Sequence, residues 1–173
     1  MQNRAVVLAM ATTLTLLGAA CSKDSTTSTT NLLPVVKYTA TLTAAAERPA
    51  PAVSNGTGTF TGTYDPNTGY LTYTVTYAGL SANSTVSHIH GPGTAEQAVG
   101  VILDFSKFGN VLFAAGNRTQ TFNGVLLMNS TTFFTTTVSG DSVRKLMDTG
   151  LAYVNVHSSL YPGGEIRGQI IKQ

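Results

Sequence analysis

The amino-acid sequence predicts an all-β fold: an antiparallel β-sandwich or barrel with Greek-key-like connections and one short helix near residues 142–148. Three observations predict it. Apolar residues alternate with threonine in several short segments, turn residues separate these segments, and charged residues make up only 10% of the chain. A period of two places apolar side chains on one face of a strand, and β-branched threonine fits a pleated surface. About seven to nine such strands favour a sandwich or a barrel.

The clearest strands form a β-hairpin over residues 58–77. In its second strand Tyr73 and Val75 face one way and threonines face the other. The turn at 65–69 reads Asp-Pro-Asn-Thr-Gly, in which Pro presets φ and Gly accepts a positive φ. The other predicted strands span residues 38–44, 86–90, 99–105, 119–126, 152–157 and 165–171, with a further candidate at 133–138.

The predicted helix follows from a local pattern of capping and apolar residues. Asp141 is an available N-cap, Val143, Leu146 and Met147 form an apolar face, and Gly150 ends the segment. We therefore expect one amphipathic helix that packs on the β-domain.

Residues 1–20 are typical of an export signal. Arg4 supplies a positive charge, residues 5–17 are mainly apolar, and residues 18–20 are the small Gly-Ala-Ala. The apolar stretch is shorter than the ~20 residues that span a membrane. We expect this signal peptide to be removed on export.

Cys21 is the only cysteine and directly follows the predicted signal. This arrangement resembles the bacterial lipobox, in which the thiol receives a diacylglycerol, but Leu17 lies one residue further from the cysteine than the lipobox leucine. The resemblance implies a lipid on Cys21, a membrane anchor and residence in the cell envelope. The alternative is simple cleavage after Ala20, which leaves a free thiol on a secreted or periplasmic protein.

Residues 21–35 are rich in Ser and Thr and lack periodicity, so they predict a flexible tether. Residues 36–173 then form a single β-domain. Of the 10 Lys and Arg residues only Arg4 lies in the first 20, so nine face eight Asp and Glu in the rest. This balance, without a basic stripe, argues against a nucleic-acid partner.

The three histidines lie in two short alternating segments. His88 and His90 are two positions apart, so in a strand their imidazoles share one face and Ile89 takes the other. His157 alternates with Val156 in the same way. We expect the histidines to converge on one outer face if the two strands are neighbours. The residues expected to be most buried are Val75, Ile89, Val154, Val156, Ile166 and Ile170.

A loop over residues 158–164 predicts the register of the last hairpin, because the alternation then agrees on both strands. In this register His157 lies opposite Glu165, Asn155 opposite Arg167, and Tyr153 opposite Gln169. Glu165 is the expected hydrogen-bond acceptor for His157. Arg167 would draw an anion to an open coordination position or pair with Glu165, and Asn155 would share their face.

A His-x-His pair with a third histidine offers three nitrogen ligands suited to copper or zinc. Binding requires neutral imidazoles, so affinity should fall as the pH drops through about 6.5. In the alternative interpretation the histidines bond to Glu165 and loop carbonyls, and merely lock the hairpin and the His-Gly-Pro-Gly loop.

Five segments together resemble the chordin-type CHRD domain family: Tyr38–Pro51, Ser87–Pro92, Gly100–Asp104, Tyr153–His157 and Tyr161–Ile170. They cover nearly the whole chain from about Val36. The resemblance implies an extracellular β-fold, found in animal chordin and in many bacterial exported proteins. It implies no settled catalytic activity.

The order of His-x-His, a late Val-His and Gly-Gly-x-x-Arg also resembles the copper half of Cu/Zn superoxide dismutase. The resemblance implies that the three histidines are copper ligands and that Arg167 is a cation beside them. The chain has no bridging histidine, no zinc ligands and a single cysteine, so the resemblance does not extend to dismutase activity.

Two functions follow. The first is a tethered binding or structural module whose partners are a membrane and an unidentified protein or surface ligand, without a cofactor. The second is a copper- or zinc-binding protein with a redox role as one option. The sequence has no Gly-x-Ser-x-Gly elbow, no Gly-rich phosphate loop and no evident catalytic carboxylate pair, so it favours a non-enzymatic protein.

Overall fold

The computed structural model describes residues 31–108, 115–132 and 134–173, so the predicted signal peptide, Cys21 and most of the tether lie outside the described residues. The described part contains nine strands, one α-helix and one short 3-10 helix. The strands are β1 (Val36–Thr43), β2 (Thr57–Asp65), β3 (Tyr70–Ala78), β4 (Ser84–His90), β5 (Val101–Asp104), β6 (Gln120–Leu127), β7 (Tyr153–Ser158), β8 (Ile166–Gln169) and β9 (Ile171–Lys172). The helices are η1 (Ala44–Ala46) and α1 (Gly140–Asp148).

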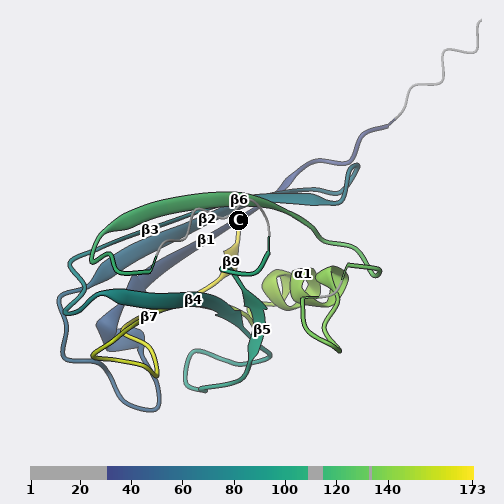
Figure 1. The fold of residues 1–173 in the computed structure, drawn as a ribbon. Coiled ribbons are helices and arrows are strands. Elements are labelled where there is room, and N and C mark those ends of the chain that lie inside the picture. The colour runs from purple at the N-terminus through teal and green to yellow at the C-terminus, as the bar shows by residue number, and fades with distance from the viewer. Residues whose placement is uncertain (1–30, 109–114, 133) are drawn as a thin grey trace, which may run out of the picture. The chain divides into compact units, whose positions relative to one another are not determined.

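The strands form one curled antiparallel sheet with the order β5-β4-β7-β8-β1-β2-β3-β6, and β9 pairs with β1. The β1–β2–β3 meander and β6 form one layer, and β4, β5 and β7 form the layer that faces it (Figure 1). The chain crosses between the layers after β3, after β5 and again after β6. This half-barrel confirms the predicted all-β class with a single short α-helix.

Apolar side chains of the two layers meet in one core. The six aliphatic residues that the alternation assigns to the core are all fully buried, which confirms that prediction: Val75, Ile89, Val154, Val156, Ile166 and Ile170. Aromatic rings bridge the layers, since Phe105 packs on Tyr73 and on Phe122 with ring centroids 4.9 and 5.5 Å apart. The core therefore fixes the faces that β4 and β7 turn away from it.

Helix α1 forms close to the predicted segment but begins earlier. Its N-cap is Ser139, whose hydroxyl accepts a hydrogen bond from the backbone N–H of Ser142. The predicted cap, Asp141, instead lies in the first turn and pairs with Arg144. A carboxylate is favoured there because the helix N-terminus carries a partial positive charge.

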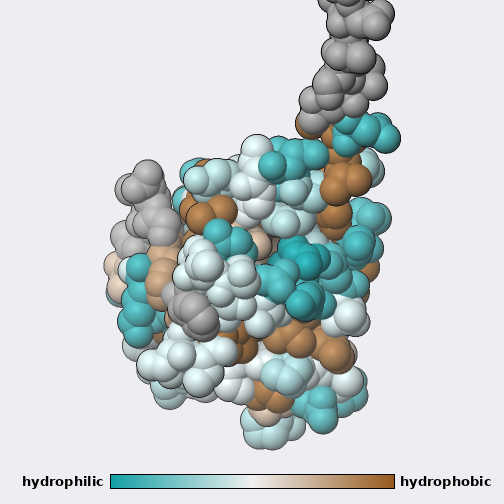
Figure 2. All heavy atoms as spheres, turned by 90° about the vertical axis from the view of Figure 1, so that its right-hand side faces the viewer, coloured by the Kyte–Doolittle hydropathy of each residue, from teal (hydrophilic) through white to brown (hydrophobic). Residues whose placement is uncertain are grey.

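The apolar face of α1 is the predicted one. Val143 and Met147 are fully buried, and Leu146 packs against the core. Gly150 follows the helix with a φ of 69°, a conformation that glycine adopts without strain. The surface on the right-hand side of Figure 1 carries both apolar and hydrophilic side chains, and a cluster of hydrophilic side chains lies near its centre (Figure 2).

Two predicted strands differ in the structure. Residues 134–138 do not form a strand, because the Thr135 hydroxyl accepts hydrogen bonds from the backbone N–H groups of Thr137 and Val138. Such local bonds compete with a ladder for the same donors. The predicted strand at 165–171 divides into β8, which pairs with β7, and β9, which pairs with β1.

Candidate metal centre

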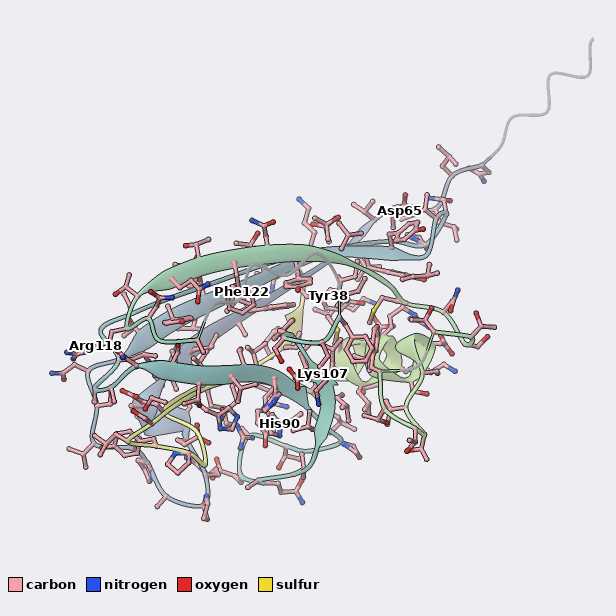
Figure 3. The ribbon with its side chains drawn as sticks, viewed as in Figure 1. Tyr38, Asp65, His90, Lys107, Arg118 and Phe122 are labelled. Atoms are coloured by element: carbon pink, nitrogen blue, oxygen red, sulfur yellow. The ribbon has the colours of Figure 1, made fainter. Side chains whose placement is uncertain are left out.

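The pairing of β4 with β7 brings the two histidine segments together. Ile89 lies opposite Val154, and both are fully buried in the core. His88 and His90 flank Ile89 and therefore project from the opposite face of the sheet. In Figure 3 the labelled His90 lies beyond β4, on the side away from Phe122, whose ring is buried between the layers.

The structure brings His88, His90 and His157 into one cluster. One ring nitrogen of each histidine lies within 4.8 Å of the other two. The ring centroids of His88 and His157 are 4.8 Å apart, and those of His90 and His157 are 5.9 Å apart. Two strands from distant parts of the sequence thus supply three nitrogen donors to one small region.

The face that carries the histidines is covered, which corrects the expectation that they point outward to solvent. Only 8% of His90 and 7% of His157 is exposed. The loops on both sides fold back over the rings, because His90 Nδ1 contacts the carbonyl oxygen of Val99 and His157 Nδ1 that of Pro162, at 2.8 and 2.9 Å. The cluster is therefore shielded from most solvent.

These two backbone contacts fix which nitrogen carries the proton. A carbonyl oxygen can only accept, so Nδ1 of both His90 and His157 must donate. In a neutral imidazole the other nitrogen, Nε2, is then left with a lone pair. The Nε2 atom of His90 is buried and has no hydrogen-bond partner among the described residues, and that of His157 lies 3.0 Å from His88 Nδ1.

The surroundings of the cluster keep its imidazoles neutral. Burial, together with the neighbouring His157 and His90, lowers the pKa of His88 to about 4. Burial likewise lowers the pKa of His90 to about 4, and it lowers the pKa of His157. The protonation step expected near pH 6.5 therefore moves to a much lower pH for His88 and His90.

Arg167 forms no ion pair with Glu165 among the described residues, and its positive charge lies near enough to His90 to add to the effect of burial, which lowers the pKa of that imidazole. Its guanidinium donates hydrogen bonds to the carbonyl oxygens of Gln97 and Thr94, each at 2.8 Å. The same group lies over the ring of Tyr153, which stacks on the ring of His90. Arg167 thus anchors the loop that covers the cluster.

The predicted register of the last hairpin is confirmed for residues 153–156 and 166–169, but the hydrogen bonds of Glu165 go to partners other than His157. Tyr153 pairs with Gln169 and Asn155 with Arg167, as predicted. The Glu165 carboxylate instead accepts hydrogen bonds from the Ser54 hydroxyl and the Ser81 backbone N–H. These donors lie far away in the sequence, so the pattern of the hairpin gave no sign of them.

Asn155 is held by a buried carboxyl group. Its amide Nδ2 donates to Glu47 Oε2 over 2.7 Å, and only 1% of Asn155 and 5% of Glu47 is exposed. Burial raises the pKa of Glu47. A Cβ at Gly164 would collide with both of these groups, and its φ of 133° also requires glycine.

Asp104 is a neighbour of the cluster that the sequence analysis did not single out. It lies opposite His88 in the β4–β5 ladder, and its Oδ2 is 3.8 Å from His88 Nε2. Burial raises the pKa of Asp104, but hydrogen bonds from Ser106 and Lys107 outweigh burial and lower it, so Asp104 is an ionised carboxylate. The short strand β5 shows too little alternation for this register to be predicted from sequence.

Comparisons with known proteins place this domain in a family. A search of curated proteins found no match. (In the structure, no helix of the described residues is long and apolar enough to cross a membrane.) A family model described as the CHRD domain matches residues 38–170, a span that includes all three histidines and both flanking layers. The chain therefore belongs to the CHRD domain family.

Proposed function

We propose that this CHRD domain binds one copper or zinc ion through His88, His90 and His157. The observation that carries the proposal is the orientation of two rings. His90 and His157 each donate Nδ1–H to a backbone carbonyl, which leaves on Nε2 the lone pair that a metal ligand needs. Histidines that bind metals typically donate their other ring proton in this way.

The donor set suits copper and zinc. Imidazole is a common ligand of both ions, and three protein ligands leave a position for water or another small ligand, as in catalytic zinc sites. Two nitrogens bound to one ion at about 2.0–2.1 Å lie roughly 3–4 Å apart. The 3.0 Å between His88 Nδ1 and His157 Nε2 is compatible with this range.

We also propose that the domain is exported and held in the cell envelope by a lipid on Cys21. The support is the sequence of residues 1–20 and the single cysteine that follows them. The anchor would make the membrane one partner of the protein. Cleavage without lipidation would release a secreted or periplasmic domain.

A second candidate function is a binding module for an unidentified protein or surface ligand. One observation favours it: a cavity of about 370 Å³ lies between the loop of residues 47–50 and the β7–β8 loop at residues 160–164. Ligand cavities commonly begin near this size. One apolar side chain of its lining, Leu160, is 59% exposed.

The metal proposal is tested by titrating the full-length chain with Cu(II) and Zn(II) beside the variants His90→Ala and His157→Ala. Wild type should bind one ion per chain. Each variant should lose more than the 10–100-fold that outer residues typically contribute, because a ligand itself is removed. Leu160→Ala, on the same side of the domain, is the matched control and should bind like wild type. Equal affinity in wild type and both histidine variants would leave the histidines a structural role and favour the binding module.

The anchor proposal is tested by mass spectrometry of the mature N-terminus. A lipidated Cys21 is the expected result, and Cys21→Ser should move the protein from the membrane to the soluble fraction. An unmodified thiol at position 21, or retention of residues 1–20, would contradict the proposal.

A further inference from the structure

We propose that Asp104 is a positioning residue that selects the metal-binding tautomer of His88. The inference rests on the proposed metal site and names a part of it that lies outside the three ligands. Asp104 comes from β5, and its carboxylate faces His88 across the β4–β5 ladder.

The hydrogen bonds of the cluster show which ring nitrogen of His88 carries the proton. His157 Nδ1 donates to the Pro162 carbonyl, so His157 Nε2 accepts. His88 Nδ1 lies 3.0 Å from that acceptor and must therefore carry the proton of this hydrogen bond. A neutral imidazole has one N–H, so His88 Nε2 holds a lone pair and faces the negative Asp104 Oδ2 at 3.8 Å without a proton between them.

Metal binding through His88 Nδ1 requires the other tautomer. The Nδ1 lone pair must face the ion, so the ring proton has to leave Nδ1 and a proton has to be taken up on Nε2. The exchange passes through solvent, and the imidazole stays neutral with one proton before and after. The Nε2–H group then points at the Asp104 carboxylate, where a charge-assisted hydrogen bond stabilises it.

A single displacement of the His88 ring serves both contacts. The Nε2 to Oδ2 distance of 3.8 Å must shorten by about 1 Å to reach a normal charge-assisted hydrogen bond. The two ring nitrogens flank the ring carbon Cε1, and their outward directions diverge strongly. Movement toward Asp104 therefore lengthens the 3.0 Å separation from His157 Nε2 and makes room for an ion between the two rings.

Asp104 is held in place to accept this bond. Its Oδ1 accepts hydrogen bonds from the Ser106 backbone N–H and hydroxyl at 2.9 and 2.6 Å. Its Oδ2 lies 3.2 Å from Lys107 Nζ, whose side chain is 71% exposed. Oδ1 is thus bound by the turn, while among the described residues the Oδ2 atom that faces His88 is shared only with an exposed lysine.

The test combines imidazole ¹⁵N NMR with zinc titration of the full-length chain carrying Cys21→Ser, alone and with Asp104→Asn. His88 should be the Nδ1–H tautomer before zinc is added and the Nε2–H tautomer afterwards. Asp104→Asn keeps the shape but removes the charge, and should weaken zinc binding about tenfold, the lower end of the range for outer residues. Asp65→Asn is the control: it makes the same carboxylate-to-amide change at the end of β2, far from the labelled His90 in Figure 3, and its zinc affinity should be unchanged.

Four results would overturn the inference. If His88 is already the Nε2–H tautomer without zinc, or if Asp104→Asn binds zinc as tightly as its parent, Asp104 does not select the tautomer, although the metal site stands. If Asp65→Asn weakens binding as much as Asp104→Asn, the effect does not depend on the carboxylate that faces His88. If the parent chain binds neither zinc nor copper, the proposed function fails and the role of Asp104 fails with it.

Discussion

The guanidinium carbon of Arg167 lies 3.4 Å from the centroid of the Tyr153 ring, and the same ring stacks on His90 with centroids 4.9 Å apart. The interplanar angle between Tyr153 and His90 is 2°. Arg167 also donates to the carbonyl oxygens of Thr94 and Gln97. One buried cation therefore connects the covering loop, an aromatic ring and one of the proposed ligands.

Arg167→Ala should lower the free energy of unfolding by about 3–5 kcal/mol. The change removes two charged hydrogen bonds, each worth about 1.5–3 kcal/mol, and a cation–π contact of roughly 2 kcal/mol when desolvated, with overlap between them. Urea denaturation measures the loss. Lys145→Ala, at a 66% exposed side chain in an ion pair, should cost no more than about 1 kcal/mol. Similar small losses in both variants would contradict the role given to Arg167.

Two adjacent isoleucines provide a matched test of the core. Ile170 is fully buried and Ile171 is 52% exposed. Ile170→Ala should lower the free energy of unfolding by about 2–5 kcal/mol, because it leaves a cavity. Ile171→Ala should cost much less, since little apolar area is lost from the core. Equal effects, measured by thermal or urea unfolding, would show that the assigned face of the last strands is wrong.

The buried histidines should make the fold less stable in acid. The pKa of His88 and of His90 is about 4 in the folded chain, below the ordinary value of about 6.5 in an unfolded one. The unfolded state therefore binds protons first, and each histidine contributes stability above about pH 6.5 that is lost as the pH falls toward 4. The contribution is roughly 3 kcal/mol per histidine at most.

Urea denaturation of wild type and His90→Gln at about pH 7 and about pH 4.5 isolates the contribution of one histidine. Glutamine does not titrate, so the variant should lose less stability on acidification than wild type. Equal losses in the two proteins would mean that His90 titrates near its ordinary pKa.

The same pKa values set the pH dependence of the proposed metal site. Burial lowers the pKa of all three proposed ligands, to about 4 for His88 and His90, so zinc affinity should hold as the pH drops through 6.5 and fall only at lower pH. The sequence alone predicts a fall through about 6.5, the value for a solvated imidazole. Zinc titrations between about pH 4 and pH 7 distinguish these two predictions. A fall of zinc affinity centred near pH 6.5 would contradict buried, neutral histidines.

The parts of the fold with strong alternation were predictable from sequence. The β2–β3 hairpin follows from its period of two, and the β7–β8 register follows because both strands agree on their buried face, as in the pair Val154 and Gly168. The cap of α1 was predicted two residues late, since Ser139 and Asp141 are both suitable N-caps. Local chemistry did not distinguish them.

Only part of the histidine cluster was predictable from sequence, namely the face of the strand on which each histidine lies. The i, i+2 spacing gives His88 and His90 a common face, but their meeting with His157 depends on the long-range pairing of β4 with β7. The partners of Glu165 are 84 and 111 residues away, so no local pattern indicates them. The loops that cover the rings are also irregular, and their backbone carbonyls carry no sequence signature.

X-ray absorption at the zinc edge of the zinc-loaded chain tests the central claim most directly. Zinc bound by His88, His90 and His157 should show three imidazole nitrogens at about 2.0–2.1 Å, the usual zinc–nitrogen distance. The imidazole count should drop by one in His90→Ala. A shell of oxygen ligands without imidazole scattering, or a spectrum that His90→Ala leaves unchanged, would contradict the account.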